Sequence, residues 1–187
     1  MVAQVIDLER FRAKVAADAG FRTWLARFKE EFGPETRLVN LSPHTLLFLA
    51  TPGEENLYVY FDLVMGARGL GASLRFKVDD VDNATKLKIM DAAFALVDRV
   101  RFEVMRRLGW VDAVPGGQLP LIEQVQQAWR QGAAFAREVP RLSPAHPGYP
   151  AYSKLGPMDQ TVFIRRLIPS AVAEFREEVD RGGEKGA

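Results

Sequence analysis

The stretch that decides the fold is residues 82–110, which reads DNATKLKIMDAAFALVDRVRFEVMRRLGW. It contains no proline, and no glycine precedes Gly109. Its apolar residues recur at helical spacing and cover more than one narrow stripe. We therefore expect a central helix over 82–108 that packs against neighbours on more than one side. The apolar residues of this pattern are Ile89, Met90, Ala93, Phe94, Leu96, Val97, Val100, Val104, Met105 and Leu108.

Both ends of this predicted helix carry residues that are typical of helix ends. Asp82 or Asn83 can accept a hydrogen bond from an amide of the first turn, which has no partner within the helix. Arg106 and Arg107 fall in the last turn, where the helix dipole favours cations. Gly109 can adopt the left-handed conformation that closes many helices. The end signals thus agree with the apolar spacing about where the helix begins and ends.

The composition narrows the class of protein. The 187 residues are 48% hydrophobic and 26% charged, which is typical of one globular domain, or of one domain with an arm. The formal net charge of +1 gives no reason to expect nucleic acid or a membrane as a partner. Cysteine is absent, which excludes a disulfide, a thiolate zinc site, an iron–sulfur cluster and a cysteine nucleophile within the chain.

The N-terminal residues predict a cytoplasmic protein. Residues 1–12 include Asp7 and Glu9, where a signal peptide would have a basic stretch followed by an apolar run. The chain has no run of about 18 apolar residues, so we expect no membrane-spanning segment. The lack of cysteine fits a reducing compartment.

An amphipathic pattern over 21–32 follows a weaker helical pattern over 7–19, and Gly33-Pro34 ends it. Its aromatic stripe carries a large apolar surface, which packs either into the core or against a partner. The last helical pattern, over 158–180, carries a second aromatic face that needs cover. The residues that we predict to form an interaction face are Phe21, Trp24, Phe28, Phe163 and Phe175.

Residues 45–78 are compatible with two structures. The apolar runs on either side of the Pro52-Gly53 turn are typical of a small β-hairpin. The apolar spacing instead favours a helix over 55–67, because Glu54 and Glu55 place acids where a helix N-terminus prefers them. We favour the helix and keep a hairpin or strand pair as the alternative.

Two further helical patterns follow the central helix, at 119–138 and 158–180. Pro169 lies inside the second pattern and should kink or split that helix. The five prolines between them make a stiff, extended stretch, which indicates a boundary. We divide the chain into parts that we expect to form one domain overall: a helical core domain (1–139), a proline-rich connector (140–157) and a C-terminal helical arm with a disordered tail (158–187).

Four charged side chains are the candidate ligand-binding residues: Asp62, Arg68, Asp98 and Arg101. Arg101 falls within the apolar arc of the central helix, where a charge needs a partner such as Asp98 or Asp62. Arg68 lies in the glycine-rich loop 66–71, which could hold an anion. That loop lacks the strand and helix context of a dinucleotide site and the Walker lysine, so a simple turn is the alternative. A structural ion pair is the alternative for Arg101.

The sequence contains no motif for catalysis or metal binding. Asp79, Asp80 and Asp82 lie close together, but they lack the further oxygen ligands and the glycine of a calcium loop. His44 and His146 lie in separate segments beside prolines, and their spacing indicates no pair. We therefore expect no catalytic residue, no metal and no cofactor.

These patterns predict a mainly α protein with roughly five or six helices packed in a bundle-like arrangement around 82–108. A small hairpin or strand pair within 45–78 is the alternative for that region. For function we favour a non-enzymatic helical interaction or assembly module that binds a protein partner or forms a homodimer. The alternative is a protein that binds a small molecule or an anion, or an enzyme, with a site near Asp62, Arg68 and Arg101.

Overall fold

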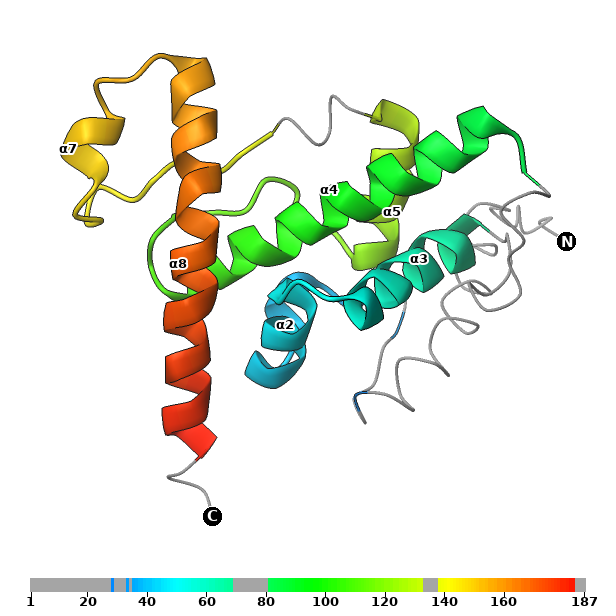
Figure 1. Ribbon diagram of the computed structural model, residues 1–187, viewed down its shortest axis with the longest axis horizontal. Coiled ribbons are helices and arrows are strands. Elements are labelled where there is room, and N and C mark those ends of the chain that lie inside the picture. Colours follow the sequence, from blue (N-terminus) through cyan, green and yellow to red (C-terminus); the bar gives the residue numbers. More distant parts are fainter. Residues whose placement is uncertain (1–27, 29–32, 34, 69–80, 133–137, 184–187) are drawn as a thin grey trace, which may run out of the picture.

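The computed structural model describes residues 28, 33, 35–68, 81–132 and 138–183. These residues fold mainly as α-helices, as the sequence predicts (Figure 1). In chain order, the elements are the 3₁₀ turn η1 (Leu38–Asn40) and the helices α2 (Pro43–Ala50), α3 (Glu54–Arg68), α4 (Asn83–Arg107), α5 (Leu121–Gln131), α7 (Tyr149–Tyr152) and α8 (Pro157–Gly183).

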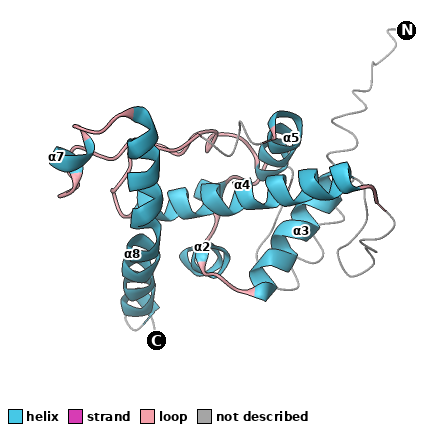
Figure 2. Cartoon of the chain, turned by 45° about the horizontal axis from the view of Figure 1, so that its top comes forward, coloured by secondary structure: helices cyan, strands magenta, loops and turns pink. Residues whose placement is uncertain are grey.

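Helix α4 is the element around which the others pack, and it contacts η1, α2, α3, α5 and α8. Figure 2 shows α8 crossing α4 near the C-terminal end of α4. Asp82 caps the start, since its carboxylate accepts bonds from the Thr85 amide at 2.9 Å and the Thr85 hydroxyl at 2.7 Å. At the end, Gly109 has a φ of 73°, and the Trp110 amide donates to the Met105 carbonyl at 2.9 Å. The predicted central helix and both of its end signals are confirmed.

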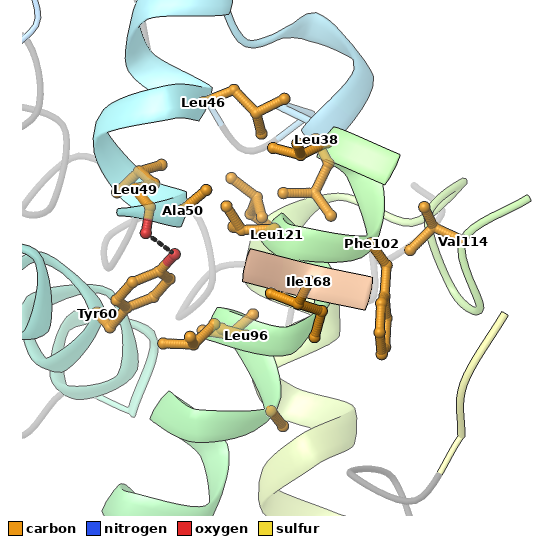
Figure 3. Packing of buried hydrophobic residues seen from close by; sticks show 14 of the residues in the cluster. Leu38, Leu46, Leu49, Ala50, Tyr60, Leu96, Phe102, Val114, Leu121 and Ile168 are labelled. Carbon is orange, nitrogen blue, oxygen red and sulfur yellow. Dashed lines mark hydrogen bonds between the residues drawn. The ribbon is translucent and has the colours of Figure 1, made fainter. Parts of the chain in front are cut away.

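The core is an apolar cluster to which α2, α3, α4, α5 and α8 all contribute (Figure 3). It includes Leu46 of α2, Leu96 and Phe102 of α4, Leu121 of α5 and Ile168 of α8, all of which are buried. Burying one such side chain stabilises the fold by roughly 1.5–3 kcal/mol. Because these residues come from distant parts of the sequence, their burial holds the helices together.

Residues 43–50 and 54–68 form the helices α2 and α3, so the predicted helix over 55–67 is confirmed and the β-hairpin alternative is wrong for this part of the chain. Ser42 caps α2, because its hydroxyl accepts a hydrogen bond from the Thr45 amide at 3.2 Å. The hairpin alternative rests on residue types and on the Pro52-Gly53 turn, and the cap and the helical spacing outweigh both. Residues 69–78, the rest of the region where strands were considered, lie outside the described residues.

Two later helices differ from their predicted form. Helix α5 ends at Gln131, because Gly132 has a φ of 55°, a conformation that glycine adopts readily. Residues 133–137 of the predicted helix lie outside the described residues. Helix α8 continues through Pro169 without being split. Pro169 is exposed, so water can satisfy the Arg165 carbonyl, which loses its helical partner there.

The proline-rich segment is attached to the chain just after α4. Leu142 pairs with Val111 in an isolated β-bridge, and the Ser143 amide donates to the Trp110 carbonyl at 2.8 Å. Beyond this point, α7 leads into α8, which packs on α2 and α4 of the same chain. The proposed division of the chain at residues 139 and 157 stays a prediction.

Candidate interaction surface

Arg101 is the residue on which the predicted ligand site was centred. Its Nε donates to the carbonyl of Ala50, the last residue of α2, at 3.3 Å. The negative end of the α2 dipole lies at this carbonyl, so the position suits a cation. The structure thus gives Arg101 a backbone partner that the sequence did not predict.

All of the last four carbonyl groups of α2 accept hydrogen bonds from side chains. The last carbonyls of a helix are short of amide donors. Here the Thr51 amide also donates to the Leu47 and Phe48 carbonyls, at 3.0 Å and 3.3 Å. Figure 3 shows one of these bonds, from the Tyr60 hydroxyl to the Leu49 carbonyl. Burial raises the pKa of Tyr60, so this hydroxyl stays a donor. The donors, in order from the Leu47 to the Ala50 carbonyl, are the Thr51 hydroxyl (2.7 Å), the Asn56 amide (2.6 Å), the Tyr60 hydroxyl (2.9 Å) and the Arg101 guanidinium (3.3 Å).

Asp98 forms an ion pair with Arg165 of α8, with 2.8 Å between the charged atoms. Burial raises the pKa of Asp98, while the positive charges of Arg165 and Arg101 lower it. The net direction is upward, so the loss of hydration outweighs the attraction. The pair links α4 to α8 at the turn where the two helices cross.

Arg68 lies in a different environment, over the ring of Trp129 in α5. Its guanidinium carbon is 4.8 Å from the ring centroid, and the ammonium of Lys88 is 6.0 Å from the same centroid. The face of an indole ring attracts cations, and one ring here attracts two. Helices α3, α4 and α5 each contribute one member of this cluster, which we call the Trp129 cluster.

The four candidate ligand-binding residues therefore do not converge on one site. Asp98 and Arg101 lie near each other and near Tyr60, because both charges act on the Tyr60 hydroxyl. Arg68 lies eight residues beyond Tyr60 on α3, which is about 12 Å along the helix axis. Asp62 is half-buried on α3. The structure brings Asp98 and Arg101 together and places Arg68 apart from them.

Two buried charged residues of α4, Arg99 and Glu103, were not predicted from the sequence. Arg99 pairs with Glu138 at 3.0 Å, and burial lowers the pKa of Arg99. The Glu103 carboxylate accepts two bonds of 2.7 Å from Arg106 and one of 3.2 Å from Arg107. Arg99, Glu103 and Arg106 are spaced as i, i+4 and i+7, so they share a helix face. That regular spacing of opposite charges is the signal that could have identified them.

The predicted aromatic interaction face has intramolecular contacts where it is described. Phe28 is half-buried, and its ring meets that of Phe48 edge-on, with 5.3 Å between the centroids. Phe163 is half-buried against α7, and Phe175 is buried in the core. A role of these residues in binding a partner stays a prediction. The two others, Phe21 and Trp24, lie outside the described residues.

A different apolar surface is exposed on the first half of α4. Leu87, Met90 and Phe94 are 62%, 44% and 53% exposed, respectively. Their spacing of i, i+3 and i+7 places them on one side of the helix. The next residues on this side are Asp98, which pairs with α8, and the buried Phe102. The same face of α4 is thus covered where α8 crosses it and uncovered before that point. We call the three exposed residues the α4 stripe.

Helix α8 has an exposed apolar pair close to the same crossing. Met158 and Val162 are exposed, and Arg165 lies on the same side of α8 at helical spacing. Arg165 forms its ion pair with Asp98, which lies on the same side of α4 as the α4 stripe. The exposed apolar rows of α4 and α8 therefore end at the same ion pair.

No three acidic or histidine side chains among the described residues are grouped as a metal site requires. Nor do the described helices include one with both the length and the apolar character of a membrane span. Comparisons with protein-family models, curated proteins and solved structures find no match to this chain. The function must therefore be inferred from the surface of the chain itself.

Proposed function

We propose that this chain is a non-enzymatic helical interaction module that binds a protein partner through the α4 stripe. The observation that carries the proposal is the alignment of Leu87, Met90 and Phe94, all exposed on one side of α4. Large apolar side chains exposed in a row are typical of a surface that a partner covers. A helix commonly anchors to another helical surface through residues at this spacing.

Two further features support an interaction role for the stripe. The stripe lies on a face of α4 that helix α8 covers one to two turns further along the chain. The same face therefore packs against one helix of this chain. The charged residues Asp98 and Arg101, two of the predicted ligand-binding residues, form an ion pair and a helix cap, respectively. Both contacts serve the internal packing of the helices.

Site-specific photo-crosslinking in the native cells tests this proposal. A benzoylphenylalanine placed at position 94 should give an adduct of one defined mass. The same residue at position 177, where Glu177 is exposed on α8, is the matched control and should give none. Adding Leu87→Glu to the chain labelled at 94 should abolish the adduct. If positions 94 and 177 give the same products, the stripe is not a binding surface.

A second candidate function, anion binding, is favoured by the Trp129 cluster. Arg68 and Lys88 place two positive charges beside one ring, and neither forms an ion pair with a carboxylate among the described residues. An anion between the cations would relieve their repulsion. Titration with inorganic phosphate should then shift the NMR signal of the Trp129 indole N–H. Arg68→Gln should remove the shift, and Arg130→Gln, which changes an exposed neighbour in α5, should retain it.

A further inference from the structure

We infer that the partner that covers the α4 stripe is a second copy of this chain, with the two α4 helices packed antiparallel about a two-fold axis. The inference rests on the proposed function, because it names the occupant of the same surface. A two-fold interface uses the same patch on both copies, so the patch must be complementary to itself. The α4 stripe and the charges beside it meet that requirement in one register.

The charges beside the stripe define the register. Lys88 and Asp91 are both exposed, and they lie one turn apart on the same edge of the stripe. A two-fold axis that passes between positions 89 and 90 places residue 88 opposite residue 91. The Lys88 ammonium lies 6.0 Å from the Trp129 ring centroid in the single chain. In the dimer, Lys88 of each copy turns from this ring to Asp91 of the partner subunit, which gives two attractive pairs. In a parallel two-fold arrangement, the edge that carries Lys88 and Asp91 would face the opposite edge of the partner's stripe, so these pairs would not form. The charge pairing therefore favours the antiparallel dimer.

The apolar residues fit together in the same register. Position 87 lies opposite position 92 of the other copy, which is midway between positions 90 and 94. Leu87 is therefore placed between the partner's Met90 and the partner's Phe94, as ridges of one helix fit grooves of another. The charge pairing and the apolar packing agree on one register although they depend on different residues.

The limited size of the patch predicts a weak dimer. Three apolar residues per copy make a smaller core than that of a standard interface, which buries roughly 1,200–2,000 Å² in total. The interface is also continuous with the packing of α8 on α4, so an already ordered helix supports it. We expect an equilibrium between one and two chains that shifts with protein concentration.

Sedimentation equilibrium of the purified full chain over a wide concentration range measures this equilibrium. The weight-average mass of the wild type should rise from one chain towards two. Phe94→Glu should remain one chain at every concentration. At a low concentration, where the wild type is also one chain, its melting temperature should be unchanged, because Phe94 is exposed. Tyr58→Glu, which alters an exposed aromatic residue of α3, should dimerise like the wild type.

A charge-exchange experiment tests the register. Lys88→Asp alone and Asp91→Lys alone should each weaken self-association about tenfold, since two attractive pairs become repulsive. An equimolar mixture of the two variants should dimerise, because the aspartate introduced at position 88 of one variant would face the lysine introduced at position 91 of the other. The double variant Lys88→Asp/Asp91→Lys should regain the wild-type association.

Three outcomes would overturn the inference. They are a wild-type mass of one chain at all concentrations, a dimer that Phe94→Glu leaves intact, and single-charge variants whose mixture does not associate. Failure of the proposed function is distinguishable from these, because it shows as the absence of a specific adduct at position 94. An adduct at 94 that contains another protein, or that joins position 94 to residues 1–27 of its own chain, would also exclude the dimer.

Discussion

The guanidinium of Arg101 and the carbonyl of Ala50 lie 3.3 Å apart, although 51 residues separate them in the sequence. Through this bond a charged side chain of α4 completes the set of donors at the C-terminus of α2. The four donors come from Thr51, from α3 and from α4, so the end of α2 is joined to two other helices. The position of α2 thus depends on polar contacts as well as on its apolar face.

Arg101→Met should lower the free energy of unfolding by about 2 kcal/mol, because a hydrogen bond from a charged donor is lost and the Ala50 carbonyl is left without it. Urea denaturation followed by circular dichroism measures the change. Arg166→Met is the matched control, since Arg166 is exposed on α8, and it should have little effect. Equal effects of the two substitutions would show that the bond to Ala50 does not contribute to stability.

Tyr60→Phe should lower the free energy of unfolding by about 1–2 kcal/mol, because it leaves the buried Leu49 carbonyl without its donor. The ring remains, so apolar packing is preserved. Tyr58→Phe removes the same hydroxyl from an exposed ring of α3 and should be neutral. A neutral result for both variants would mean that water replaces the lost donor at Leu49.

The central helix was predictable because its signals are local. Asp82, Gly109 and the apolar spacing between them lie within one stretch, and each acts on its own neighbourhood. The partner of Arg101 was not predictable, because it depends on where α2 ends and how α2 packs on α4. A sequence shows that a charge within an apolar arc needs a partner, but it does not show that the partner is a distant carbonyl.

The α4 stripe was not predicted for a similar reason. Met90 and Phe94 belong to the apolar pattern from which packing on several sides was expected, yet both are exposed. Periodicity tells which residues share a face, whereas tertiary structure decides how much of that face is covered. Helix α8 covers the turns from Asp98 onward, and no local signal marks that limit.

The stability contributed by Asp98 should fall as the pH rises. Burial raises the pKa of Asp98 above its ordinary value of 3.8, so the folded state binds this proton more tightly than the unfolded state. The resulting stabilisation is present below the ordinary pKa and is lost as the pH rises through the folded pKa. The free energy of unfolding of the wild type minus that of Asp98→Asn should therefore decrease from pH 4 to pH 7, as measured by urea titrations. A difference that grows with pH would show that the attraction to Arg165 outweighs burial.

Phe175→Ala should lower the free energy of unfolding by about 3–5 kcal/mol, the usual cost of removing a buried aromatic side chain. Phe175 is buried in the core cluster, although it lies near the C-terminal end of the longest helix described. Its substitution therefore tests whether α8 is an integral part of the fold. Thermal and urea denaturation of the full chain give the measurement.

The matched control is Phe94→Ala, which makes the same chemical change on the exposed part of α4. Removal of an exposed ring opens no cavity, so this variant should lose little stability under conditions where the chain is monomeric. The two variants together separate the roles of the two aromatic residues.

If Phe175→Ala is as mild as Phe94→Ala, then α8 is dispensable for folding. In that case removal of residues 141–187 should also leave a soluble, stable chain. If Phe175→Ala is severe, that truncation should expose the groove beneath α8 and cause aggregation, because the apolar faces of α2 and α4 would lose their cover.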